Sequence, residues 1–237
     1  MGKIQLITLD LDNTLWDVDS IIIAAEAELV QWLGQHVPDS LQHYNTHQLG
    51  EIRQEVFRRF TDRAHDLSFM RTEVLYEVMR RTGLADPEAR RNAELAFAVF
   101  FEGRNRVQFF PGALEMLEQL SRQFVIYALT NGNANIHKAG LGDYVEGAFS
   151  SADVGNKKPH PAMFEAPLKR TALKPHQAIH IGDHLVDDIH GAESVGMHSI
   201  WVNLTGHARG PQDATPTREV THLSSVAQAV EDIILRS

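Results

Sequence analysis

Two aspartates stand one residue apart, directly after a short apolar run. The run Ile4-Gln5-Leu6-Ile7-Thr8-Leu9 is typical of a buried β-strand, and Asp10-Leu11-Asp12-Asn13-Thr14 follows it. Two carboxylates this close at the end of a buried strand need a partner, because an uncompensated buried charge is costly. Ligand sets made only of oxygen favour Mg²⁺. The structural alternative is a capped helix start, since Asp and Asn are good N-cap residues.

Further polar residues that suit phosphate chemistry stand just beyond two later apolar runs and in a loop between them: Thr130, Asn131, Lys158, Asp183, Asp187 and Asp188. Carboxylates can gather a divalent cation, a hydroxyl can hold a phosphate oxygen, and a lysine can neutralise an anion. Each of these residues alone also fits a turn or a helix cap. Together, at the carboxyl ends of parallel strands, they indicate a site for phosphate chemistry.

The elements that must position these residues alternate between strands and helices. Apolar runs predict strands at 4–9, 124–129, 146–149, 178–181 and 199–202. Helical patterns follow Pro111-Gly112 and cover 161–171, 187–195 and 226–235, while 205–218 has the composition of a loop. This alternation predicts an α/β fold, a Rossmann-like doubly wound parallel sheet covered on both faces.

Residues 16–107 interrupt the alternation with helical periodicity alone. An apolar face runs from Ile21 to Leu33, and further helices are predicted near 46–61, 68–82 and 86–102. The predicted organisation is therefore a catalytic core formed by 1–15 and 108–237, with an all-α cap domain at 16–107. The insert follows the first strand's carboxyl end and would lie over the site.

Composition excludes several classes of protein. The chain has 237 residues, of which 43% are hydrophobic, enough for a large domain or a core with an insert. Cysteine is absent, which excludes disulfides and thiolate metal sites. A net charge of −9 argues against nucleic-acid and membrane-surface partners, and no stretch approaches the roughly 20 apolar residues of a membrane span. The predicted strand at Ile4 leaves no room for a signal peptide, so we expect a cytoplasmic protein.

Four motifs together resemble those of the haloacid dehalogenase-like hydrolases. In order and spacing they are Asp10-Leu11-Asp12-Asn13-Thr14, Thr130-Asn131, Lys158-Pro159 and Gly182-Asp183-(x)₄-Asp188. The resemblance covers essentially the whole chain, and the helical insert is similar to the C1-type cap of this superfamily. Within the superfamily, Leu129-Thr130-Asn131-Gly132-Asn133-Ala134 and Gly140-Leu141-Gly142-Asp143-Tyr144 resemble bacterial phosphatases that act on flavin mononucleotide and related sugar phosphates.

The resemblance implies a catalytic role for each of the first two aspartates. Asp10 would be the nucleophile that forms an aspartyl-phosphate. Asp12 would protonate the leaving alkoxide and then act as base on the water that hydrolyses the intermediate.

The resemblance also implies how the phosphoryl group and its cofactor are held. Substrate binding would fall to Thr130, Asn131 and Lys158. Mg²⁺ would be held by the Asp10 carboxylate, the Asp12 backbone carbonyl and Asp183. Asp187 or Asp188 would act through water or orient Lys158.

The expected function is Mg²⁺-dependent hydrolysis of a small phosphomonoester, such as flavin mononucleotide or a riboflavin-pathway phosphate, by a monomer or homodimer. A haloacid dehalogenase is a second possibility in the same fold, but family members with that activity lack the second aspartate. A phosphosugar mutase uses the same core. A non-catalytic sensor of phosphate ligands is the alternative from another class, and it would not require Asp12.

Three residues are candidates for substrate selection: Trp16, Phe69 and Arg71. Aromatic and guanidinium groups can hold a planar or anionic ligand, whereas helix-core packing is the structural alternative. His184 stands beside the expected metal ligand Asp183, where small polar residues are common in the family, and we interpret it as a residue of the site's rim.

Overall fold

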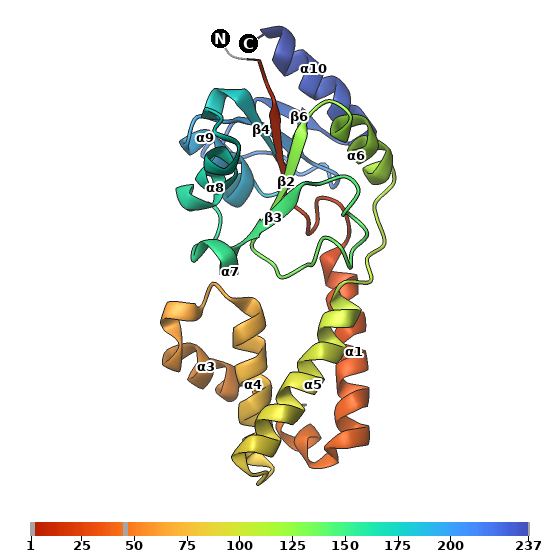
Figure 1. Cartoon of the computed structure of the whole chain (residues 1–237), viewed down its shortest axis with the longest axis vertical. Coiled ribbons are helices and arrows are strands. Elements are labelled where there is room, and N and C mark those ends of the chain that lie inside the picture. Colours follow the sequence, from red (N-terminus) through yellow and green to blue (C-terminus); the bar gives the residue numbers. More distant parts are fainter. Residues whose placement is uncertain (1–2, 45–46, 237) are drawn as a thin grey trace. The chain divides into compact units, whose positions relative to one another are not determined.

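The computed structural model describes residues 3–44 and 47–236, which form two compact units (Figure 1). The core unit comprises Met1–Asp17 and Gln108–Ser237, and the helical unit comprises Val18–Val107. The chain leaves the core unit after Asp17, two residues later than predicted. It returns to the core unit at Gln108, as predicted. Trp16 therefore belongs to the core unit, because its backbone forms bridges to Asp12 and Phe109.

A six-stranded sheet forms the centre of the core unit, in the order β3-β2-β1-β4-β5-β6, and all its pairs are parallel. Its strands are β1 (Leu6–Leu9), β2 (Val125–Thr130), β3 (Gly147–Ser150), β4 (Ala178–Gly182), β5 (His198–Val202) and β6 (Arg218–Val220). The apolar runs predicted the first five. β6 was not predicted: it begins at the end of the predicted loop 205–218, and three residues at a sheet edge carry too little periodicity to be recognised.

Helices cover both faces of this sheet, as the doubly wound prediction requires. Figure 1 shows α8 (Pro161–Thr171) and α9 (Gly191–Ser194) on one face, and α6 (Ala113–Ser121) and α10 (Val226–Arg236) on the other. The short helix α7 (Ser151–Val154) follows β3. An apolar cluster packs α8 and α9 against the strands through Leu6, Leu129, Met163, Phe164, Leu168, Ala178, Ala192 and Met197. β1, which carries Asp10 at its end, is fully buried between β2 and β4.

The helical unit contains α1 (Val18–His36), α2 (Leu41–Tyr44), α3 (His47–Arg59), α4 (Leu67–Arg81) and α5 (Asp86–Arg104). Short 3₁₀ turns lie at Pro38–Ser40 and Thr61–Arg63. Among residues 18–44 and 47–107 no strand occurs; residue 46, the predicted start of the second helix, lies outside the described residues. The unit has its own apolar cluster, which extends from Ala25 and Leu29 on α1 to Ala96 and Phe100 on α5.

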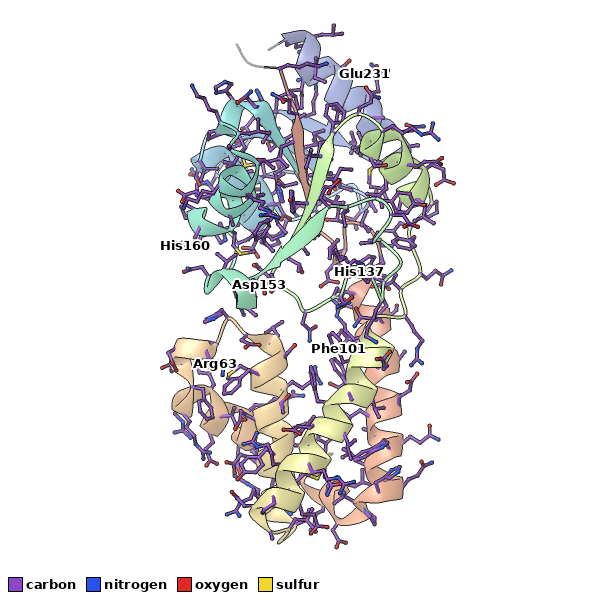
Figure 2. All side chains as sticks on the ribbon, viewed as in Figure 1. Arg63, Phe101, His137, Asp153, His160 and Glu231 are labelled. Atoms are coloured by element: carbon purple, nitrogen blue, oxygen red, sulfur yellow. The ribbon has the colours of Figure 1, made fainter. Side chains whose placement is uncertain are left out.

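Two arginines of the helical unit stack on phenylalanines. Arg63, labelled in Figure 2, lies with its guanidinium carbon 3.6 Å from the centre of the Phe69 ring. Arg71 lies equally close to the Phe100 ring and is paired with Glu26, at 2.5 Å between Nη1 and Oε1. Phe69 and Arg71, the predicted ligand residues, thus pack within the helical unit; their part in substrate selection stays a prediction.

None of the helices in the described part of the chain has the length and apolar character of a membrane span.

Candidate active site

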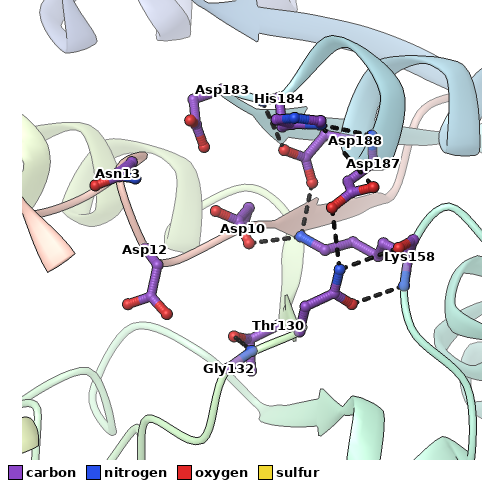
Figure 3. Close-up of a pocket in the computed structure, with 11 residues that line it drawn as sticks. Asp10, Asp12, Asn13, Thr130, Gly132, Lys158, Asp183, His184, Asp187 and Asp188 are labelled. Carbon is purple, nitrogen blue, oxygen red and sulfur yellow. Dashed lines mark hydrogen bonds and ion pairs between the residues drawn. The ribbon is translucent and has the colours of Figure 1, made fainter. Parts of the chain in front are cut away.

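A polar pocket lies at the carboxyl ends of β1, β2 and β4, within the core unit (Figure 3). All the site residues predicted from sequence line it: Asp10, Asp12, Thr130, Asn131, Lys158, Asp183, Asp187 and Asp188. Asn13, Gly132 and His184 complete the lining. The pocket exists because parallel strands bring their carboxyl ends to one edge of the sheet.

Lys158 bridges two buried carboxylates at the base of the pocket. Its Nζ donates to Asp10 Oδ1 at 2.5 Å and to Asp188 Oδ1 at 2.6 Å, as Figure 3 shows. The side chains of all three residues are at most 9% exposed. One cation is thus shared by two anions in a place where water screens little.

Burial and charge shift these ionisations in different directions. Burial raises the pKa of Asp10 to about 8, and the charges of Asp188 and Asp183 add to this rise while Lys158 opposes it. Burial also acts to raise the pKa of Asp188, but Lys158 and a hydrogen bond from His180 outweigh it and hold the pKa below its usual range. The two carboxylates raise the pKa of Lys158 despite its burial, so this lysine stays charged.

Thr14 contacts two carboxylates of the pocket, Asp183 and Asp10. Thr14 Oγ1 donates to Asp183 Oδ1 at 2.9 Å and lies 3.1 Å from Asp10 Oδ2. Burial, together with the charge of Asp188, raises the pKa of Asp183 to about 6. Thr14 is fully buried and was not among the predicted site residues; its four-residue spacing from Asp10 was the available signal.

Asp10, Asp183 and Asp188 can each offer one carboxylate oxygen within 4.8 Å of the others. Such a set of hard oxygen donors fits Mg²⁺, and the negative charges of neighbouring carboxylates add to the burial that raises the pKa values of Asp10 and Asp183. Asp188 is already engaged by Lys158, so Asp10 and Asp183 are the carboxylates best suited to hold the metal.

Asn131 holds the loop that carries Lys158 through hydrogen bonds to its backbone. Its side-chain Nδ2 donates to the Lys158 carbonyl at 3.0 Å, and its Oδ1 accepts from the Lys158 backbone N–H at 2.7 Å. The same Nδ2 lies 3.2 Å from Asp187 Oδ2. The amide therefore orients Lys158 and Asp187, while its predicted contact with substrate stays a prediction.

Thr130 lies at the end of β2 and is buried. Its Oγ1 accepts a hydrogen bond from the Gly132 backbone N–H at 2.8 Å, which fixes the turn after the strand. A hydroxyl that accepts one hydrogen bond keeps its own hydrogen for a further acceptor, such as a phosphate oxygen.

Asp12 is held by the indole of Trp16, whose Nε1 donates to Asp12 Oδ1 at 2.8 Å. In Figure 3 the Asp12 carboxylate points away from Lys158. Trp16 is fully buried and meets the Phe109 ring edge-on, with 5.7 Å between ring centres. The expectation that Trp16 stacks on a substrate is therefore wrong, because its ring faces are packed inside the protein.

Asp187 and Asp188 lie on a π-helical turn, Leu185–His190, where the sequence predicted an α-helix from 187. His184 caps this turn through its Nδ1, which accepts from the Asp187 backbone N–H at 3.0 Å. Short π-helical segments are frequent at functional sites. His184 lies at the rim as expected, and capping the turn is its observed contact.

A family model described as haloacid dehalogenase-like hydrolase matches residues 4–196. The Escherichia coli protein named 5-amino-6-(5-phospho-D-ribitylamino)uracil phosphatase YigB is 30% identical over 97% of this chain and 98% of its own length. A glyceraldehyde 3-phosphate phosphatase of Pyrococcus furiosus is 29% identical over 88% of this chain and 84% of its own.

A solved structure described as a 2-haloacid dehalogenase from Pseudomonas syringae has a TM-score of 0.90 to this chain and 36% sequence identity. The match covers 97% of this chain and 99% of the other. Relatives of this chain thus carry names of two chemistries, cleavage of phosphate esters and removal of halogen from carbon.

Proposed function

This chain belongs to the haloacid dehalogenase-like hydrolases, and we propose that it is a Mg²⁺-dependent phosphatase of small phosphomonoesters. The observation that carries the proposal is the buried Asp10 carboxylate, bound to Lys158 and placed beside Asp183 in a pocket whose rim holds a second carboxylate, Asp12. A nucleophile, a cation and a separate acid-base group are what displacement at phosphorus requires.

Asp10 supplies the nucleophile in this scheme. One of its carboxylate oxygens attacks phosphorus, the bond from phosphorus to the ester oxygen breaks, and an aspartyl-phosphate forms. Lys158 compensates the charge of both the carboxylate and the incoming phosphoryl group, which would otherwise repel each other. Thr130 and the backbone N–H groups after β2 donate hydrogen bonds to the phosphoryl oxygens.

Asp12 acts as the general acid and then as the general base. It gives one proton to the departing alkoxide and, as a carboxylate, takes one from the water that then attacks phosphorus. The bond from phosphorus to Asp10 breaks in that second step, which releases inorganic phosphate and restores both aspartates. Asp12 lies two residues beyond Asp10 on the same loop, and in Figure 3 its carboxylate points away from Lys158, so it does not compete with Asp10 for that cation.

Asp10, Asp183 and the Asp12 backbone carbonyl are the groups that would hold Mg²⁺ in this pocket. When bound, the ion supplies positive charge that offsets the carboxylates and the phosphate dianion. The role of this chain's own residues is to keep those oxygens close together, and Thr14 does so through its hydrogen bond to Asp183.

For the substrate we propose a phosphorylated polyol or sugar chain on a planar ring, of which flavin mononucleotide is one example. Support comes from the name of the Escherichia coli relative, in which the substrate is a uracil that carries a phosphoribitylamino chain.

The test is phosphate release by the purified protein from a panel of phosphomonoesters, with Mg²⁺ and with chelator. The panel contains flavin mononucleotide, sugar phosphates and mononucleotides, and Asp10→Asn is the control. We expect turnover that requires Mg²⁺ and falls to background in the control. Turnover that persists in Asp10→Asn, or no turnover of any ester by folded protein, would contradict the proposal.

Dehalogenation is the second candidate, because a structure with 36% identity carries that name. A halide leaves carbon without a proton, so the leaving group in that reaction needs no general acid, whereas an alkoxide leaving group needs the proton that Asp12 can give. Halide release from 2-haloalkanoic acids, measured beside the phosphate panel, decides between the two.

A further inference from the structure

His180 is a fully buried histidine on β4 that the proposed reaction does not use. The parallel pairing of β1 with β4 places it directly beside Thr8. Its Nδ1 lies 2.8 Å from Thr8 Oγ1, and its Nε2 lies 3.1 Å from Asp188 Oδ1. The Phe164 ring meets the imidazole edge-on, with 5.1 Å between ring centres, so packing also restricts the ring. A chain of contacts thus runs from β1 through His180 to the residue that anchors Lys158.

The partners of the ring determine which nitrogen carries hydrogen. Asp188 is ionised and can only accept, so the hydrogen must be on Nε2. In a neutral ring Nδ1 is then an acceptor, and the Thr8 hydroxyl donates to it. Burial lowers the pKa of His180, which agrees with a neutral ring. Thr8 therefore fixes the tautomer in which His180 donates to Asp188.

Asp188 is consequently held from three directions. Its Oδ1 accepts from Lys158 and from His180, and its Oδ2 accepts from the His184 backbone N–H at 2.9 Å. A carboxylate held in this way can fix the Lys158 ammonium at a single position. The neutral His180 ring holds Asp188 in place without adding a second positive charge that would compete with Lys158 for this carboxylate.

We propose that His180, with its tautomer fixed by Thr8, is a positioning residue that aims Lys158 at Asp10 and the phosphoryl group through Asp188. The inference rests on the proposed phosphatase function, because its kinetic test needs a reaction to measure. Wild-type turnover on the ester panel establishes the function first, and only the variants test the role of His180.

The test compares His180→Leu with His180→Gln. Leucine removes both ring nitrogens, whereas the glutamine amide keeps one donor and one acceptor. We expect kcat of the leucine variant to fall about 10- to 100-fold, the usual cost of losing a group that orients a direct participant, with a smaller change in KM. Affinity for orthovanadate, which mimics the pentacoordinate phosphorus, should fall in parallel with kcat. Glutamine should restore most of both losses.

Two further variants make the comparison decisive. His198→Leu removes a histidine from the neighbouring strand β5 that faces His176 and Glu193, and it should leave kcat and vanadate affinity unchanged. Thr8→Val keeps the side-chain volume but removes the donor to Nδ1, and it should lower kcat in the same direction as leucine. If His180→Leu does not fold, Thr8→Val and His180→Gln still decide the question.

The tautomer has a readout that does not depend on activity. Nitrogen chemical shifts of ¹⁵N-labelled histidine should show a neutral ring with hydrogen on Nε2 in the wild type, and a mixture of tautomers in Thr8→Val. The inference is overturned if folded His180→Leu or Thr8→Val keeps wild-type kcat and vanadate affinity, if glutamine is as impaired as leucine, or if the wild-type ring carries its hydrogen on Nδ1.

Discussion

Lys158 is the single cation that two buried carboxylates share at the base of the pocket. Each of the three charges would be costly alone, and the ion pairs make the group tolerable inside the protein. The position of this lysine therefore serves stability and the proposed chemistry at once.

Replacing Lys158 by methionine should destabilise the protein by about 3–5 kcal/mol, because it leaves Asp10 and Asp188 buried without a counter-charge. Denaturant unfolding near pH 8 measures this. Lys169→Met is the matched control: that lysine pairs with Glu165 at 3.0 Å on the surface, where both side chains are well exposed, and its loss should cost under about 1 kcal/mol. Equal losses for the two variants would show that Lys158 does not compensate buried charge.

Trp16→Phe should act on turnover through Asp12. Phenylalanine keeps an aromatic ring beside Phe109 and loses the N–H that holds the Asp12 carboxylate, together with part of the volume of the buried indole. An alkyl phosphate needs a proton on its leaving oxygen, whereas 4-nitrophenyl phosphate has a leaving group that departs without one. We expect a larger loss of kcat on alkyl than on aryl phosphates. A uniform loss across both ester types would assign Trp16 a packing role alone.

Asp10, Thr130 and Asp183 could be predicted from sequence because each follows a recognisable apolar run, whereas Lys158 stands in a loop and was identified only together with the other motifs. Trp16 could not, since its contact with Asp12 depends on a loop that pairs with Phe109, far along the chain. The role of His180 could not be predicted either. It stands inside an apolar strand, and its contact with Thr8 depends on the register between the two strands.

Gly182 shows how a strand end limits the residue that can stand there. A Cβ on Gly182 would lie 2.3 Å from Asp188 Cγ, closer than any real contact, because the carboxylate packs directly against the end of β4. Gly182→Ala must therefore displace Asp188 and, with it, Lys158. We expect a loss of phosphatase activity and a destabilisation of about 1–3 kcal/mol, measured by turnover and denaturant unfolding.

Gly34 on α1 is the matched control for this substitution. A Cβ there would meet only Leu41 Cδ1, at an ordinary 3.5 Å. Alanine at Gly34 should leave activity unchanged and add about 0.4–1 kcal/mol of stability by restricting the unfolded chain. Normal activity in Gly182→Ala would mean that Asp188 does not need its observed position.

Strands and helices with strong periodicity were predictable at this scale, whereas several short elements were not. β6 is three residues long and takes its definition from pairing with β5. The π-helical turn at Leu185–His190 has the composition of an α-helix. Its residue Asp188 contacts Lys158, His180 and the His184 backbone, and no local pattern reveals these contacts.

For the whole molecule, stability should depend on pH and Mg²⁺ together. In the unfolded chain Asp10 and Asp183 have pKa values of about 4, whereas folding raises them to about 8 and about 6 through burial. Between about pH 4 and pH 8 the metal-free folded state therefore binds more protons than the unfolded chain. These two groups accordingly lower stability as the pH rises through this range. Mg²⁺ binds the ionised carboxylates and competes with those protons.

The rise in Tm caused by Mg²⁺ should accordingly grow from about pH 6 to about pH 9, as the acidic cluster loses its protons. Thermal unfolding with Mg²⁺ and with chelator across this range measures it. In Asp10→Asn the growth above about pH 7 should disappear, because the group with the higher pKa is gone. A Mg²⁺ effect of the same size at every pH would contradict the assignment of Asp10 as a ligand.

The placement of β1 at the centre of the sheet has a consequence for the order in which the protein is made. The helical unit is one continuous segment, and its apolar cluster is complete once Phe100 has been added. β1 is synthesised earlier, yet its neighbours are Val125–Thr130 and Ala178–Gly182. A ribosome must therefore produce all of Val18–Val107 before the strand that carries Asp10 gains its first partner, and a chain terminated before β4 leaves that strand with an open edge.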